Sequence, residues 1–262
     1  MEELRILAIN PGSTSTKIAV FSGANPVFVR TISHSAEELS KFDKITDQYA
    51  FRKAIIYKQL EEAGIEMDTI RAVVGRGGLT KPIPSGVYEV NEIMKQDMVN
   101  SPMGEHASNL GGFIADDIAK SLPNARAFIA DPVVVDELEP HARVSGHPEF
   151  QRKSIFHALN QKATARQHAK SIMRKYEDLN LIVVHLGGGI SVGAHKKGLV
   201  VDVNQALDGE GPFSPERSGT LPAADLVRAC FSGKFTQKEL LVMIKGKGGM
   251  TAFLGTNNAY DV

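Results

Sequence analysis

The sequence predicts a two-domain α/β protein with a boundary near residue 150. Three short apolar runs joined by tight turns open the chain and predict an antiparallel meander, after which helices alternate with single strands. Beyond the boundary, an apolar strand again runs into a Gly/Ser turn and a hairpin. We therefore expect domains of similar plan over residues 1–150 and 151–262.

In the first half, short apolar runs bounded by Gly, Pro, Ser or Asn predict strands at residues 4–10, 17–21, 27–32, 72–74 and 127–130. Thr46 is placed to cap a helix that ends at Gly64. A second helix is predicted from apolar residues at helical spacing, namely Leu110, Phe113, Ile114 and Ile118.

In the second half, a helix is predicted from the spacing of Ala165, Ala169, Ile172, Met173 and Tyr176. The apolar run 181–186 predicts a buried strand, and 191–195 and 199–203 predict a hairpin. Thr236 and Glu239 form a capping-box pair before a further helix, which Gly246 can end.

Composition excludes several classes of protein. The 30 basic and 30 acidic residues cancel, so no overall field favours nucleic acid or an anionic membrane. The single cysteine, Cys230, excludes a disulfide framework and fits a reducing cytoplasm. We expect neither a signal peptide within residues 1–20 nor a membrane span.

Two segments share one design, in which a buried strand enters a turn rich in glycine and hydroxyl groups: residues 9–16 (INPGSTST) and 185–191 (HLGGGIS). Glycine lets backbone N–H groups approach a phosphate, and hydroxyls add further donors. Either segment alone is better explained by a simple hairpin turn, but the pair favours nucleotide binding. Walker A and G-x-G-x-x-G patterns do not occur, which argues against a Walker-type NTPase and a dinucleotide oxidoreductase.

Two arginines lie in loops that suit a fork-like grip on a carboxylate or phosphate. Arg76 stands between glycines at the end of a predicted strand, and Arg217 stands in the Pro- and Gly-rich loop 211–222. Glu216 is a possible structural partner for the second loop. The alternative for each arginine is a solvated loop residue.

Asp131 ends the strand FIAD and is placed to bind Mg²⁺ or to orient an arginine, or instead to cap a turn. His157 could stabilise charge on a phosphoryl group, although a partly buried histidine at a helix start is commoner. His185 lies in an apolar strand, where a core histidine is the commoner case, and His106 is ambiguous. The remaining histidines considered are expected to be exposed and without a role: His34, His168 and His195.

Together these motifs resemble the acetate kinase family of the acetate and sugar kinase/heat-shock/actin superfamily. INPGSTSTK, GRGG, FHALNQKA, HLGGGIS and GPFSPERSG follow one another in the family order over nearly the whole chain. The first turn and the PERSG loop are more similar to the family's butyrate kinases than to its acetate kinases, which tend to carry Cys-Gly-Ser-Ser and Thr-Arg-Ser-Gly there.

The resemblance implies two ribonuclease H-like (actin-like ATPase) domains, each a mixed five-stranded sheet flanked by helices, with the active site in the interdomain cleft. The first would serve the acid and phosphate. The second would serve the nucleotide and be incomplete at its C-terminal end, since family members are longer. Adenosine-binding residues and a further magnesium-linked glutamate would then follow Val262.

The resemblance also implies roles. Arg76 and Arg217 would clamp the acid and the phosphoryl group in transit, and His157 would hydrogen-bond that group. Asn10 and Asp131 would help to hold Mg²⁺. The nucleotide phosphates would meet Gly12, Ser13, Thr14, Ser15, Lys17, His185, Gly187, Gly188 and Gly189.

The implied reaction is ATP-dependent, reversible phosphorylation of a short-chain fatty acid, butyrate or isobutyrate, to an acyl phosphate by direct in-line transfer. Its partners would be the acid, ATP or ADP, and further copies of the chain in a homo-oligomer. The alternatives are an acetate or propionate kinase, an ATP-binding switch of the same superfamily that is not a kinase, and an inactive binding fragment.

Overall fold

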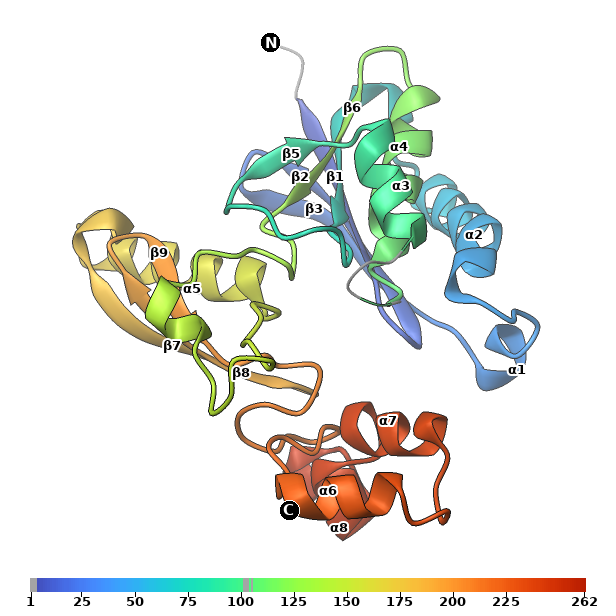
Figure 1. Ribbon diagram of the computed structural model, residues 1–262. Coiled ribbons are helices and arrows are strands. Elements are labelled where there is room, and N and C mark those ends of the chain that lie inside the picture. The colour runs from blue at the N-terminus through green and yellow to red at the C-terminus, as the bar shows by residue number, and fades with distance from the viewer. Residues whose placement is uncertain (1–3, 101–103, 105) are drawn as a thin grey trace. The chain divides into compact units, whose positions relative to one another are not determined.

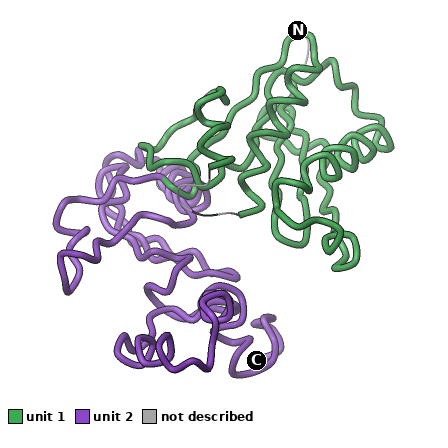
Figure 2. Tube along the Cα trace, turned by 45° about the vertical axis from the view of Figure 1, so that its right-hand side comes forward, with its two compact units in different colours: residues 1–134 green, residues 135–262 purple. Residues whose placement is uncertain are grey.

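The computed structural model describes residues 4–100, 104 and 106–262. The chain divides into two compact units, Met1–Val134 and Val135–Val262, coloured green and purple in Figure 2. This division comes earlier along the chain than residue 150. Each unit has its own sheet, so each is described separately.

The first unit contains a six-stranded sheet in the order β3-β2-β1-β4-β6-β5 (Figure 1). Its strands are β1 (Arg5–Pro11), β2 (Ser15–Ser22), β3 (Asn25–Ser33), β4 (Ile70–Arg76), β5 (Val87–Glu89) and β6 (Arg126–Ala130). The first three form the expected antiparallel meander, and β1, β4 and β6 run parallel. The short β5 adds an antiparallel edge strand to the five that were expected.

Helices α2 (Tyr49–Glu62), α3 (Glu92–Asn100) and α4 (Asn109–Lys120) gather beside this sheet (Figure 1). The four apolar residues that predict α4 are fully or partly buried on it, in a core that includes Leu7, Ile9 and Val73. Gly75 of β4 and Gly111 of α4 let the two backbones touch, because a Cβ on Gly75 would overlap Gly111 O and a Cβ on Gly111 would overlap Arg76 O. This close approach positions the end of β4, which carries Arg76.

Two short elements precede α2: α1 (Ala36–Leu39), which Ser35 caps through a capping box with Glu38, and a 3₁₀ turn, Ile45–Gln48. Thr46 lies inside that turn, so its predicted role as a helix cap is wrong. The end of α2 is as expected, because Gly64 adopts the left-handed conformation with φ 64°.

The second unit has a three-stranded antiparallel sheet of β7 (Asn180–Leu186), β8 (Ile190–Lys196) and β9 (Leu199–Val203). Within the described residues it therefore has three of the five expected strands. Lys197 and Gly198 make the β8–β9 turn with φ values of 49° and 86°, as a two-residue hairpin requires.

Helix α5 (Ala158–Ser171) packs against β7. Ala165 and Ala169 are buried as predicted, but the helix ends before the other three residues of the expected face. Met173 adopts φ 55°, which breaks the helical path, and its side chain is 95% exposed. Tyr176 is nevertheless buried, from a separate 3₁₀ turn.

The chain closes with α6 (Ala223–Cys230), α7 (Gln237–Lys245) and α8 (Gly249–Leu254). The predicted capping box of α7 is confirmed: Glu239 N donates to Thr236 Oγ1, Glu239 accepts from Thr236 N, and Gly246 is the C-cap. Among the described helices, none has the length and apolar character needed to cross a bilayer.

Candidate active site

Polar side chains gather where β1 and β4 end in the first unit. Asn10 at the end of β1 lies opposite Lys17 of β2, and both side chains are exposed. Arg76 ends the parallel neighbour β4 and donates from Nη1 to Asn10 Oδ1 over 3.2 Å. Three predicted site residues therefore share one edge of the sheet, as parallel strands with coincident carboxyl ends allow.

Arg76 is a half-buried cation. Its burial lowers the pKa of the guanidinium, and no carboxylate in the described part of the chain forms an ion pair with it. A partly desolvated arginine without a carboxylate partner gains from an incoming anion. The geometry therefore suits a carboxylate or phosphate at this edge.

The hydroxyl-rich loop between β1 and β2 is held from behind by Arg52 of α2. Arg52 is fully buried, and its guanidinium donates to Ser13 O at 3.2 Å, Ser15 O at 3.0 Å and Thr16 Oγ1 at 2.9 Å. Gln48 Oε1 accepts two further bonds from it. Because the loop carbonyls are occupied on the inner side, the exposed outer side of Ser13 and Thr14 remains open to an anion.

His34 is the second brace of this loop, and the expectation that it is exposed is wrong. It is 5% exposed, its Nε2 lies 2.9 Å from Thr16 Oγ1, and its backbone N donates to Thr14 O at 2.8 Å. Burial, and then the charge of Arg52, lower the pKa of His34, whereas Glu38 opposes that shift. His34 therefore supports the loop as a neutral imidazole.

Asp131 follows β6, two strands from Asn10, and is 6% exposed. Its Oδ1 accepts from Ser85 Oγ at 2.6 Å and from Gly86 N at 2.9 Å, so it orders the segment before β5. Its φ of 38° is rare outside glycine and is a form of backbone strain that gathers at functional sites. The turn-organising alternative is therefore present, whatever its role towards a metal.

The side-chain oxygens of Asn10 and Asp131 suit a magnesium ion that is already bound to nucleotide phosphates. No cluster of three or more His, Cys, Asp or Glu side chains able to hold a metal occurs among the described residues. Mg²⁺ commonly needs only one or two protein oxygens, because phosphates and water complete its shell. Asn10 and Asp131, at the ends of β1 and β6, are the donors of this kind at the edge.

The glycine turn of the second unit carries Arg217 directly against it. A Cβ on Gly189 would overlap the Arg217 guanidinium, so only glycine allows this approach. Ser214 Oγ donates to Gly188 O at 2.6 Å, and Glu216 N donates to the same oxygen at 3.3 Å. The predicted glycine turn and arginine loop therefore form one local structure.

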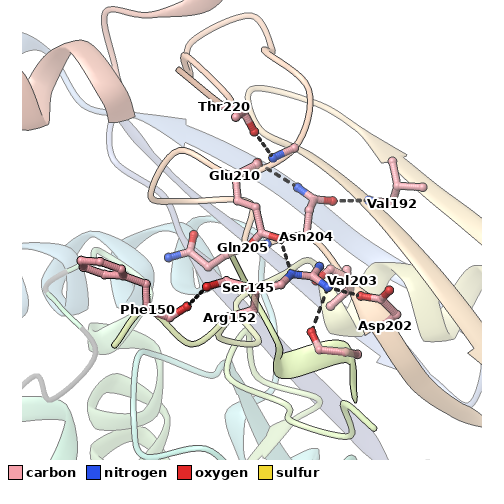
Figure 3. A network of polar contacts seen from close by, with 12 residues as sticks. Ser145, Phe150, Arg152, Val192, Asp202, Val203, Asn204, Gln205, Glu210 and Thr220 are labelled. Carbon is pink, nitrogen blue, oxygen red and sulfur yellow. Dashed lines mark hydrogen bonds and ion pairs between the residues drawn. The ribbon is translucent and has the colours of Figure 1, made fainter. Parts of the chain in front are cut away.

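A polar network fastens the start of this arginine loop to the sheet (Figure 3). Arg152 donates to Glu210 Oε1 at 2.7 Å and to Asp202 Oδ1 of β9 at 2.9 Å. Asn204 accepts from Val192 N of β8 at 2.8 Å and donates to Glu210 O at 3.2 Å. The loop that presents Arg217 is thus anchored to both strands of the hairpin.

His157 and His185 come together in the second unit. Their rings stack with centroids 3.7 Å apart and planes inclined by 10°. His157 Nδ1 lies 2.9 Å from Ser191 Oγ, and His185 Nδ1 lies 2.9 Å from Asn160 Oδ1. His185 is half-buried near the end of β7 and contacts His157 and Asn160, so its environment differs from that of an enclosed core histidine.

His195 is 2% exposed, so the expectation that it is exposed is also wrong. It contacts Gln161 and Tyr176, neither of which was among the predicted site residues. Burial first, and then Lys162, lower the pKa of His195 to about 4, while Glu137 opposes them. His106, whose role was ambiguous, accepts from Ser108 N at 3.1 Å and orders a turn.

Sequence reasoning missed four supporting residues, although a local signal existed for two of them. Arg52 lies on the apolar face of α2, one turn before Ile56, so a buried arginine was readable from helical spacing. His195 alternates with Ser191 along β8, which places both on the buried face. The positions of His34 and Gln161 depend on distant partners and had no comparable local signal.

The comparisons with known proteins agree with this geometry. A sequence profile described as the Acetokinase family matches residues 148–259. Butyrate kinase 2 of Clostridium acetobutylicum is 58% identical over 260 residues, covering 99% of this chain and 73% of that protein. Butyrate kinase 1 of the same organism is 58% identical over 252 residues, covering 96% of this chain and 71% of that protein.

Solved structures show the same fold. An acetate kinase from Porphyromonas gingivalis superposes with a TM-score of 0.73 at 17% identity, covering 97% of this chain and 71% of that one. A propionate kinase from Francisella tularensis superposes with a TM-score of 0.70 at 18% identity, covering 98% and 72%. The predicted actin-like ATPase fold is confirmed, and the near full-length identity shows that the chain belongs to the acetokinase family, among its butyrate kinases.

Proposed function

We propose that this chain transfers the γ-phosphoryl group of ATP reversibly to the carboxylate of butyrate or isobutyrate, and so forms an acyl phosphate and ADP. The observation that carries the proposal is the 58% identity over 260 residues to a butyrate kinase. Two arginines placed against strand-end loops support it. The reducing cytoplasm inferred from the single cysteine, and assembly with further copies of the chain, belong to the same proposal.

The main obstacle to this reaction is charge repulsion, because a carboxylate attacks a triphosphate. Arg76 would bind the acid or the phosphoryl group at the edge of the first sheet. Arg217 would meet the phosphoryl group beside Gly189, while Gly187 and Gly188 direct backbone N–H groups at the phosphates. Preorganised donors of this kind each contribute roughly 3–4 kcal/mol to lowering a barrier. Magnesium, held through Asn10 and Asp131, would offset further phosphate charge.

The reaction requires no general base. A carboxyl group with a pKa of about 4–5 is already ionised at neutral pH, so the nucleophile needs no activation. His157 would instead donate a hydrogen bond to the phosphoryl group as it passes between oxygens. Asn10, Ser13, Thr14, Ser15 and Lys17 would receive the γ-phosphate on the outer side of the braced loop. In this proposal each of these residues either positions the substrates or neutralises charge, the two requirements of phosphoryl transfer.

An acyl hydroxamate assay tests the proposal. The chain is incubated with ATP, Mg²⁺, hydroxylamine and, in turn, butyrate, isobutyrate, propionate and acetate. We expect the highest kcat/KM with the four-carbon acids, since each methylene in an apolar pocket is worth roughly 1–3 kcal/mol. No hydroxamate from any of the acids would contradict the proposal, and a preference for acetate or propionate would move the chain to those alternatives.

Arginine variants test whether the chain is a kinase or a nucleotide switch. We expect Arg76→Ala and Arg217→Ala each to lower kcat/KM about 10²–10³-fold, while ATP still binds by calorimetry. Arg174→Ala, on the surface after α5, is the matched control. If Arg217→Ala retained full acid-dependent turnover, the role given to its loop would be wrong.

A further inference from the structure

One face of β8 is built to receive a side chain from α5. Ser191, Gly193 and His195 alternate along the strand and are all buried. Gln161 of α5 is fully buried between them, one helical turn after His157. A Cβ on Gly193 would overlap Gln161 Oε1, so glycine at this position leaves the space that the amide occupies. The arrangement connects His157 to His195 through the Ser191 hydroxyl and a single buried amide.

The orientation of that amide follows from one backbone atom. Gln161 Nε2 lies 3.0 Å from Ser191 O and 2.8 Å from Ser191 Oγ. A carbonyl oxygen can only accept a hydrogen bond, so the atom facing it must be the NH₂ group. The amide oxygen therefore faces His195, whose Nε2 lies 2.9 Å away.

The amide oxygen in turn determines the tautomer of His195. Since Oε1 only accepts, His195 Nε2 must carry a proton. Burial and the nearby Lys162 ammonium lower the pKa of His195 to about 4, which keeps the ring neutral near pH 7. Its Nδ1 is then bare and accepts from the Tyr176 hydroxyl at 2.6 Å. Every proton at this end of the chain of hydrogen bonds has one assignment.

The proton positions at the His157 end of this network follow from the same donors and acceptors. Ser191 Oγ accepts from Gln161 Nε2, which leaves its own proton available to donate to His157 Nδ1, 2.9 Å away, and we assign it there. Nδ1 of His157 is then an acceptor, and the ring proton lies on Nε2. Stacking on His185 at 3.7 Å also opposes charging both rings, because two imidazolium ions at that separation would repel.

We propose that Gln161 is a positioning residue for the phosphorylation proposed above, on which this inference rests. Through Ser191 it holds His157 as the neutral tautomer that carries its proton on Nε2. A neutral ring with its proton on Nε2 can donate a hydrogen bond to the phosphoryl group. It need not release that proton, because the attacking carboxylate is already ionised. Gln161 itself contacts neither substrate nor reacting atom in this arrangement and acts only through the serine.

Tautomers are measured directly by ¹⁵N-resolved NMR of the ¹⁵N-histidine-labelled 262-residue chain at pH 8. His157→Gln and His195→Gln identify the two rings. We expect both rings to be protonated on Nε2 and bare on Nδ1. A wild-type His157 protonated on Nδ1, or an equal mixture of its tautomers, would overturn the proposal without the need for any variant of the network.

Ser191→Ala and Gln161→Leu remove the links in turn. Both are expected to convert His157 to a mixture of tautomers, and Gln161→Leu also removes the acceptor of His195 Nε2. Gln167→Leu is the matched control, because Gln167 is an exposed glutamine on the same helix. If Gln161→Leu gives the same His157 tautomer as Gln167→Leu, the proposed coupling is wrong.

Kinetics supply the functional readout. We expect Gln161→Leu to lower kcat about tenfold, since losing a phosphoryl donor outright costs roughly 10²–10³-fold and a tautomer mixture loses part of that. KM for ATP and for the acid should stay within about twofold, because ground-state binding is untouched. Equal kcat for Gln161→Leu and Gln167→Leu would overturn the positioning role. An inactive wild-type chain with the expected tautomers would count against the proposed phosphorylation instead, because the NMR result does not depend on turnover.

Discussion

The two strand-end loops of this chain are each held by an arginine, but in different ways. The first loop is rich in hydroxyl groups and lies between β1 and β2, with its carbonyls bound from behind by the buried Arg52. The second consists of glycines after β7 and has an arginine laid directly on its backbone. In the first unit the cation supports the loop from behind, whereas in the second the guanidinium lies against Gly189 of the loop and donates to Ala206 O.

The strands that carry the loops differ in the same sense. β1 lies inside its sheet, paired on both sides by β2 and β4. β7 is an edge strand of its described sheet, and its Ile182, Val184 and Leu186 are 71%, 48% and 75% exposed. The loop after the central strand β1 is supported by neighbouring strands and by α2. The glycine turn after the edge strand β7 is supported by the loop that carries Ser214 and Arg217. This difference predicts which substitutions each unit tolerates.

Arg52→Met should lower the free energy of unfolding more than any of the substitutions that follow. It leaves Ser13 O, Ser15 O and Gln48 Oε1 without their buried donor, and unsatisfied buried acceptors cost roughly 1–3 kcal/mol each. We expect the free energy of unfolding to fall by about 3 kcal/mol in urea denaturation followed by circular dichroism. Lys58→Met, on the exposed side of α2, is the control, with an expected change of at most about 0.5 kcal/mol. Equal effects of the two would show that the loop needs no internal cation.

Gly189→Ala should lower the stability of the protein much more than Gly12→Ala does. The new methyl group at 189 would displace the Arg217 guanidinium, and such overpacking costs about 1–3 kcal/mol. At Gly12 the same group would lie 3.4 Å from Ser15 O, an ordinary contact, so we expect a change of at most about 0.5 kcal/mol. Thermal unfolding of both variants beside Gly146→Ala, where a Cβ meets open space, measures the contrast. A larger loss at Gly12 would reverse the comparison.

Each unit also carries one buried neutral histidine, so stability should fall as the pH is lowered. Burial lowers the pKa of His195 from 6.5 to about 4, and the pKa of His34 is lowered as well. Below pH 6.5 these histidines therefore bind protons in the unfolded chain but not in the folded chain. Their contribution to stability is fully present above pH 6.5 and is lost as the pH falls. We expect His195 alone to account for about 3 kcal/mol lost by pH 4.

Urea denaturation at pH 7, 6, 5 and 4 measures this slope. The slope should be smaller in His195→Gln and in His34→Gln, and unchanged in His168→Gln, whose histidine is exposed. An unchanged slope in His195→Gln would mean that this ring is charged when folded. A reduction confined to one variant would show that only one unit uses a neutral histidine.

The smallest expected contrast compares one serine from each loop. Ser214 is 2% exposed, donates to Gly188 O and accepts from Arg217 N at 3.1 Å. Ser214→Ala should therefore lower the unfolding free energy by about 1 kcal/mol. Ser13→Ala removes an exposed hydroxyl and should change stability by less than about 0.5 kcal/mol, while raising KM for ATP if that hydroxyl meets phosphate. A stability loss at Ser13 matching that at Ser214 would remove the distinction between the loops.

Local patterns predicted the elements well where the signal is contained in one segment. The meander, α4, the β8–β9 hairpin and the Thr236 capping box each depend on residues a few positions apart. The prediction was wrong where a single backbone angle intervened, as at Met173, which ends the helix without a glycine or proline to announce it. Strand β5 is three residues long and carries too little pattern to be predicted.

The sequence by itself determined the order of strands, the two loops, and the arginines that follow them, because these depend on local conformation and spacing. Only the tertiary structure decided which polar side chains are buried behind the loops. Arg52 meets Ser13 across 39 residues, and Gln161 meets Ser191 across 30. Periodicity shows which way a residue faces along its own element, but the partner that satisfies a buried charge or amide is chosen by packing between elements.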